Sequence, residues 1–116
     1  MSRDPLRVPD YLDHIREAIS RIQKYCEDID QTAFLLNPLV QDAVIRNFEI
    51  IGEASKNVPQ NIKVKYQNIP WDEMYRLRNR ISHEYFGIDY EILWDIARNY
   101  LPQNHEDILK VIKSEG

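Results

Sequence analysis

Apolar side chains recur at spacings of three and four residues along most of the chain, and no other feature restricts its fold as much. The first stripe predicts an amphipathic helix from about Pro9 to Cys26, with charged residues on its other face. Its apolar members are Leu12, Ile15, Ile19, Ile22 and Cys26. No segment alternates apolar and polar residues as a half-buried strand would, and three glycines suit a helical core better than a turn-rich sheet. The pattern therefore predicts an all-α fold.

A second long helix is predicted to begin at Pro38. Asn37 is a good N-cap residue, and proline is common at the first helical position. The apolar band that follows is broad, which indicates burial against more than one neighbour: the first helix and, in a dimer, a second subunit. Its members are Leu39, Val40, Ala43, Val44, Ile45, Phe48, Ile51, Ala54 and Val58. Pro59 ends this helix because the residue before a proline favours an extended backbone, and residues 60–70 suggest a short helix or turn with an irregular connector.

Further helices are predicted in the C-terminal half of the chain. One runs from Trp71 to near Gly87, with acidic residues in its first turn, where the helix dipole favours them. Asp89 is expected to cap another. Pro102 is expected to interrupt that helix, and Asn104 to begin a last one, because proline breaks a helix interior. Four to five helices with short joints predict an up-and-down bundle.

At 116 residues the chain is expected to form a single domain over residues 1–116. A domain this small buries only about two-thirds of its unfolded surface, so an oligomer, a homodimer or a higher one, would help it by hiding more. No stretch reaches the roughly 20 apolar residues that span a bilayer, and the first residues lack a secretory signal. Cys26 is the only cysteine, so no intrachain disulfide can form. We therefore expect a cytoplasmic protein with no membrane contact.

The charge pattern concentrates positive charge in the centre of an acidic chain. The formal net charge is −4, yet residues 56–83 carry six basic side chains against two acidic ones. Such a centre could hold a phosphate locally, although net negative charge argues against broad nucleic-acid binding. Ordinary solvated charge on a helix face explains the same pattern equally well.

Among the three histidines, His83 is the candidate catalyst. His14 falls on the polar side of the first predicted helix and His105 in the first turn of the last, where surface roles are expected. His83 stands in a last helical turn, whose negative dipole end favours the imidazolium. Arg78 supplies a forked cation suited to phosphate oxygens. A general base and a cation can cleave RNA at a ribose 2′-hydroxyl without a metal.

The spacing of this pair raises a geometric question. Positions five apart on an ideal helix point about 140° from each other. The helix therefore ends or distorts before His83, or Arg78 and His83 converge with the same residues of a second chain. Asn79 could hydrogen-bond His83 or the helix end, and Tyr85 could orient a phosphate. The alternative is a solvated arginine-rich helix whose histidine caps its last carbonyls.

Other residues are assigned structural roles. Glu49 and Glu53 lie four apart and could bind a metal, but salt bridges to the arginines of the third long helix or to Arg46 are favoured. Trp71 and Trp94 fit a core or interface better than base stacking. No glycine-rich phosphate loop or nucleophile elbow occurs. We expect no metal and no cofactor.

From Arg78 to Tyr85 the chain resembles the HepT-like branch of the HEPN superfamily, whose motif reads R-x4-H-x-Y. Arg78, His83 and Tyr85 occupy the motif positions, and Asn79 is the frequent polar residue after the arginine. The wider pattern also matches, and the likeness covers nearly the whole chain. It includes Pro70-Trp71 upstream, Asp89 and Trp94 downstream, and Arg46-x-x-Glu49-x-x-Gly52-Glu53-Ala54 in the preceding long helix.

The resemblance implies a dimeric helical bundle whose two motifs share one cleft. It implies a metal-independent endoribonuclease toxin directed at transfer or messenger RNA. It also implies a neighbouring MNT-type nucleotidyltransferase antitoxin, which can transfer AMP from ATP to the motif tyrosine, here Tyr85. A bulky anionic adduct two residues from His83 would block the cleft and repel an RNA phosphate.

We therefore expect a toxin of a type II toxin–antitoxin system, with Arg78 as phosphate clamp and His83 as general acid or base. Asn79 supports the site, and Tyr85 contacts substrate and is the target of AMPylation. The alternative is a non-catalytic helical module that binds a nucleotidyltransferase. A third interpretation is an RNA-binding protein that does not cleave.

Overall fold

A computed structural model describes residues 7–83 and 87–115, and for Ser82 and His83 it describes the backbone alone. All regular structure in these ranges is helical, as the periodicity predicted. The segments are α1 (Val8–Cys26), α2 (Gln31–Leu35), α3 (Pro38–Asn57), α4 (Gln60–Lys65), α5 (Trp71–His83), α6 (Tyr90–Asp95), the π-helical turn η2 (Ile96–Tyr100) and α7 (Leu101–Glu115).

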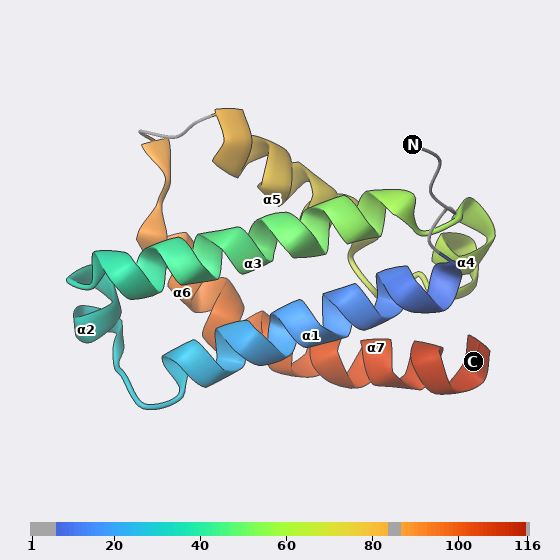
Figure 1. The fold of residues 1–116 in the computed structure, drawn as a ribbon, viewed down its shortest axis with the longest axis horizontal. Helices are drawn as coiled ribbons and strands as arrows, with labels where there is room; N and C mark the ends of the chain where they lie inside the picture. The colour runs from blue at the N-terminus through green and yellow to red at the C-terminus, as the bar shows by residue number, and fades with distance from the viewer. Residues whose placement is uncertain (1–6, 84–86, 116) are drawn as a thin grey trace, which may run out of the picture.

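Four long helices, α1, α3, α5 and α7, run alternately in opposite directions (Figure 1). α3 packs against α1 on one side and α5 on the other, and α1 in turn packs against α7. This matches the predicted up-and-down bundle, with the shorter segments α2, α4 and α6 at its ends and joints. In the order α5, α3, α1, α7, the motif helix α5 is an edge helix. It packs mainly on α3 and keeps Asp72, Glu73, Arg76 and Arg80 exposed.

The first helix forms where the stripe predicted it. Leu12, Ile15, Ile19, Ile22 and Cys26 are all buried. At its start the Asp10 carboxylate accepts a hydrogen bond from the backbone N–H of Arg7 at 3.0 Å, which satisfies one donor that the helix leaves unpaired.

The second long helix has the predicted boundaries. The Asn37 side chain accepts a hydrogen bond from the backbone N–H of Val40, and Pro38 occupies the first turn. At the other end Val58 is extended, with ψ 130°, as expected before Pro59. The broad apolar band is buried only in part within one chain: Val44, Phe48, Ile51, Ala54 and Val58 are buried, whereas Leu39 is 80% exposed.

The predicted break at Pro102 is wrong. The chain stays helical from Tyr90 through Glu115, and Asp89 caps its start by accepting from the N–H groups of Glu91 and Ile92. The turn η2 is wider than an α-turn, and the N–H of Leu101 bonds to the carbonyl of Ile96. Pro102 follows directly and has no N–H to donate. A widened turn before a proline repositions the carbonyl group that such an N–H would have bonded. The chain changes direction here (Figure 1).

Both tryptophans serve packing. Trp71 is buried at the start of α5 and donates its indole N–H to the carbonyl of Tyr66. Trp94 is half-buried, with its ring centroid 5.3 Å from that of Phe34. No helix in the described parts of the chain is long and apolar enough to cross a membrane.

Candidate functional site

The motif helix α5 is helical from Trp71 through His83, its last described residue. A distortion before His83 was one way for Arg78 and His83 to meet, and the described backbone contains none. The predicted site residue Tyr85 lies outside the described residues, which resume at Gly87, where this helix was predicted to end. Arg78 and Asn79 are half-buried, and their side chains define the described part of the motif.

Gly52 decides how Arg78 lies on α3. A Cβ atom at position 52 would fall 2.2 Å from Cβ of Arg78, 2.9 Å from its Cγ and 2.8 Å from the carbonyl oxygen of Met74. Ordinary carbon contacts are about 3.5–4.0 Å, so no other residue fits without displacing α5. The glycine therefore lets the stem of Arg78 cross directly over the backbone of α3.

The guanidinium of Arg78 is held by two neighbours. Its Nη2 lies 3.5 Å from Oε2 of Glu53, and its Nη1 donates a hydrogen bond to Oδ1 of Asn79 at 3.1 Å. The Arg78 side chain keeps 33% of its surface exposed, so the cation remains accessible to a ligand. The expectation that the glutamates of α3 pair with arginines of this helix is confirmed at Glu53.

Arg78 also lines a groove of ≈ 380 Å³ on the open face of α3. Three helices contribute to it: α1 and α3 form most of the wall, and α5 supplies the arginine. The lining residues are Tyr11, His14, Arg46, Glu49, Ile50, Glu53, Ala54, Asn57 and Arg78. A ligand held by Arg78 would therefore extend along α3.

The basic centre at residues 56–83 is partly neutralised in the folded chain. The ion pairs described in this segment include Lys65 with Glu115 at 2.8 Å, Arg76 with Asp72 at 3.8 Å and Arg78 with Glu53 at 3.5 Å. The ammonium of Lys56 lies 5.8 Å from the centroid of the Tyr75 ring. These contacts leave a smaller local excess of positive charge than the sequence indicates. For binding a phosphate, the position of Arg78 therefore matters more than the total charge of the segment.

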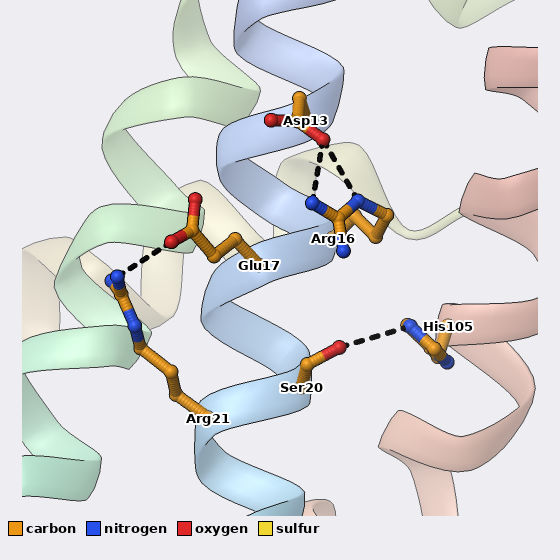
Figure 2. A network of polar contacts seen from close by, with 6 residues as sticks. All are labelled: Asp13, Arg16, Glu17, Ser20, Arg21 and His105. Carbon is orange, nitrogen blue, oxygen red and sulfur yellow. Dashed lines mark hydrogen bonds and ion pairs between the residues drawn. The ribbon is translucent and has the colours of Figure 1, made fainter.

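The other two histidines have different surroundings. His105 was expected at the surface, but it is half-buried between α7 and α1. Its Nε2 lies 3.2 Å from Oγ of Ser20, and the two side chains point toward one another (Figure 2). His14 is exposed, as expected, yet it lines the groove beside Arg78. Its place in the groove is a feature that the sequence alone did not indicate.

The role of Gly52 and the two α1 residues of the groove were not predicted from the sequence. Gly52 offered a signal, because a glycine inside a strongly helical segment often marks a close approach of another backbone. Tyr11 and His14 offered none, since their place depends on how α1 packs against α3. In the described residues, no three side chains of metal-binding type gather into a cluster that includes Glu49 and Glu53.

The fold and the motif residues define a helical protein with an arginine presented at the edge of a bundle. A model of the family described as ribonuclease HepT-like matches residues 15–112. The chain therefore belongs to the ribonuclease HepT-like family of the HEPN superfamily, and the resemblance found at the motif is confirmed.

Three relatives show the same likeness. A protein of Methanocaldococcus jannaschii named as an RNase candidate is 43% identical over 89% of this chain and 85% of its own length. The probable ribonuclease HepT of Thermococcus cleftensis is 45% identical over 80% of this chain and 84% of its own. Another M. jannaschii protein, named as a gamma-glutamylcyclotransferase and also as an RNase candidate, is 41% identical over 89% of this chain. The chain spans only 46% of that protein's length. No solved structure matches the chain.

Proposed function

We propose that this protein is a metal-independent endoribonuclease, the toxin of a type II toxin–antitoxin system. The observation that carries the proposal is the presentation of Arg78 by α3: its stem crosses Gly52, and its forked cation is held by Glu53 and Asn79 while remaining partly exposed. Family membership and the ribonuclease names of the relatives support the same activity.

In the proposed reaction Arg78 binds a non-bridging phosphate oxygen and stabilises the charge that develops on the phosphorane. One imidazole takes the proton of the ribose 2′-hydroxyl. The 2′-oxygen then bonds to the adjacent phosphorus as the bond to the 5′-oxygen breaks, and the leaving oxygen takes a proton from an imidazolium. The products are a 2′,3′-cyclic phosphate and a free 5′-hydroxyl. His83 fills the acid or base role, and Asn79 steadies the arginine.

We propose that the complete site is formed by two copies of the chain. α5 is regular through His83, and positions five apart on such a helix face about 140° from each other. Arg78 and His83 of one chain therefore do not share a face. α5 is also an edge helix, which leaves it open to a second α5. A homodimer could bring the arginine of one chain to the histidine of the other.

Regulation is proposed to act at Tyr85. A cognate MNT-type nucleotidyltransferase would join the α-phosphorus of ATP to the tyrosine oxygen and release pyrophosphate. The adduct adds negative charge and bulk close to His83, so it would repel the phosphate of tRNA or mRNA. No cofactor is needed for RNA cleavage in this scheme, because the two side chains supply the acid–base and electrostatic functions.

The test is incubation of the purified chain with total RNA and excess chelator. The parent should cleave, whereas Arg78→Ala and His83→Ala should lose cleavage but keep helicity and dimerisation. Arg76→Ala is a matched control, because it removes an arginine of the same helix whose side chain is 70% exposed. Intact RNA from a parent protein shown by mass spectrometry to carry no adduct would reject the ribonuclease and favour the binding module.

A further inference from the structure

We propose that the groove on α3 is a subsite for one nucleotide of a single-stranded RNA, adjoining the phosphate held by Arg78. This inference rests on the proposed function, because Arg78 is both the proposed phosphate clamp and part of the groove wall. A strand bound at Arg78 has its neighbouring nucleotide within the groove. The volume of ≈ 380 Å³ and its position beside the clamp suit one base with its ribose.

The wall contributed by α1 carries two rings. Tyr11 and His14 lie three residues apart, so they are neighbours on the same face of the helix. Tyr11 is half-buried against the core and His14 is exposed. Unpaired bases stack on aromatic side chains such as tyrosine and histidine, and single-stranded RNA offers unpaired bases.

Arg46 marks the end of the groove away from Asn57, and it lies six residues from Gly52, over which Arg78 crosses, or about 9 Å along the α3 axis at 1.5 Å per residue. Its side chain is exposed and makes no ion pair or hydrogen bond with any residue that the structure describes. A cation with no counterion among the described residues of an acidic protein is suited to a backbone phosphate. Arg46 and Arg78 would then contact successive phosphates of the strand.

The carboxylates favour a base over a phosphate between these two cations. Glu53 is already engaged by Arg78, whereas Glu49 is half-buried and lines the groove. A carboxylate repels phosphate but accepts hydrogen bonds from amino groups on the base edge. Glu49 therefore selects a base that carries an exocyclic amino group, and uracil, which has none, is disfavoured.

The experiment measures binding apart from cleavage. Short fluorescent oligonucleotides with 2′-O-methyl groups lack the attacking hydroxyl, so their affinity for the full chain can be followed by anisotropy over a range of salt. Arg46→Ala should weaken binding about tenfold and reduce the slope of log K against log salt by about 0.7, the value for one phosphate of a single strand. His14→Ala should weaken binding about fivefold without changing this slope.

Two further measurements complete the test. Arg16→Ala is the matched control, since it removes a partly exposed arginine of α1 that pairs with Asp13 and lies outside the groove (Figure 2). Its affinity should equal that of the parent. The parent should bind oligo-C at least tenfold more tightly than oligo-U, and Glu49→Gln should reduce that preference, because an amide can also donate to the uracil carbonyls.

Three outcomes overturn the subsite: groove variants that bind like Arg16→Ala, a parent that binds no oligonucleotide, or groove variants that change the sedimenting species. The last result would assign the groove to a second copy of the chain. If the parent cleaves RNA but the groove variants bind normally, the subsite fails and the proposed ribonuclease stands. If the parent binds through Arg46 without cleaving natural RNA, the ribonuclease fails and the subsite stands.

Discussion

Replacing Gly52 with alanine tests how α3 presents Arg78. The new Cβ would meet Cβ of Arg78 at 2.2 Å, more than 1 Å inside the ordinary contact distance of about 3.5 Å. Neither of the two closest obstacles, a Cβ and the Met74 carbonyl oxygen, can move by changing a side-chain rotamer. α5 must therefore shift away from α3.

The stability change combines two opposing effects. Overpacking that shifts a backbone costs about 3 kcal/mol, at the upper end of the usual range. Alanine is about 1 kcal/mol more favourable than glycine inside a helix. The net loss of about 2 kcal/mol corresponds to a Tm decrease of about 8 °C for a chain of this size. Without the close contact, the same substitution would raise Tm by a few degrees. The sign of the Tm change therefore shows whether the close contact between α3 and α5 exists.

The assay is thermal unfolding followed by circular dichroism, with RNA cleavage measured in parallel. The pair Asp42→Gly and Asp42→Ala gives the intrinsic difference between glycine and alanine at an exposed position of α3. Adding Arg78→Gly to Gly52→Ala should restore part of the stability, since two of the three nearest obstacles, Cβ and Cγ of Arg78, are then removed. A displacement of about 1 Å should also lower cleavage about 100-fold. An unchanged or higher Tm with full cleavage would refute the close approach.

Three other predictions follow from the described contacts. Arg78→Lys keeps the charge but loses the two-pronged donor, so cleavage should fall at least tenfold at unchanged helicity, as a single-turnover assay would show. Hydrogen bonds from Lys65 and Tyr66 lower the pKa of the Glu115 carboxyl from its ordinary value of 4.5. The contribution of Glu115 to stability is therefore present above pH 4.5 and is lost as the pH falls through the lower pKa of the folded state. The Glu115→Gln variant should show a weaker dependence of Tm on pH. Burial raises the pKa of the Cys26 thiol, so alkylation at pH 8 should be far slower in the native protein than in urea, as mass spectrometry can follow.

Local signals predicted the helices well because each acts within a few residues. Asn37 accepts from the N–H three residues on, and Asp89 does the same two and three residues on, as their N-cap positions required. Pro102 misled the prediction because a proline can either end a helix or follow a widened turn. The choice depends on the packing of η2 and α7 against α1, which no short segment of sequence encodes.

The site was predictable only in part. The motif located Arg78, and charge complementarity anticipated a partner among the glutamates of the preceding long helix, which Glu53 confirms. Which glutamate pairs depends on the axial register of α3 against α5. Gly52 sets that register through a contact with a residue far along the chain. The groove required the position of α1 as well, so His14 was assigned to the surface with no further role.

The ion pair between Glu53 and Arg78 suggests how an acidic chain can still bind RNA. At 3.5 Å, with half of the Glu53 side chain exposed, this pair contributes at most about 1 kcal/mol and is screened by salt. A phosphate can therefore replace Glu53 at little cost. Until then the carboxylate and Gly52 keep the guanidinium over α3, so less conformational freedom is lost when the phosphate binds. In the proposed function, one arginine placed in this way would bind the phosphate that a protein of net charge −4 could not hold with a diffuse basic surface. The motif helix therefore depends on α3 in three ways: Gly52 supports Arg78, Glu53 is its counterion, and α3 forms a wall of the groove.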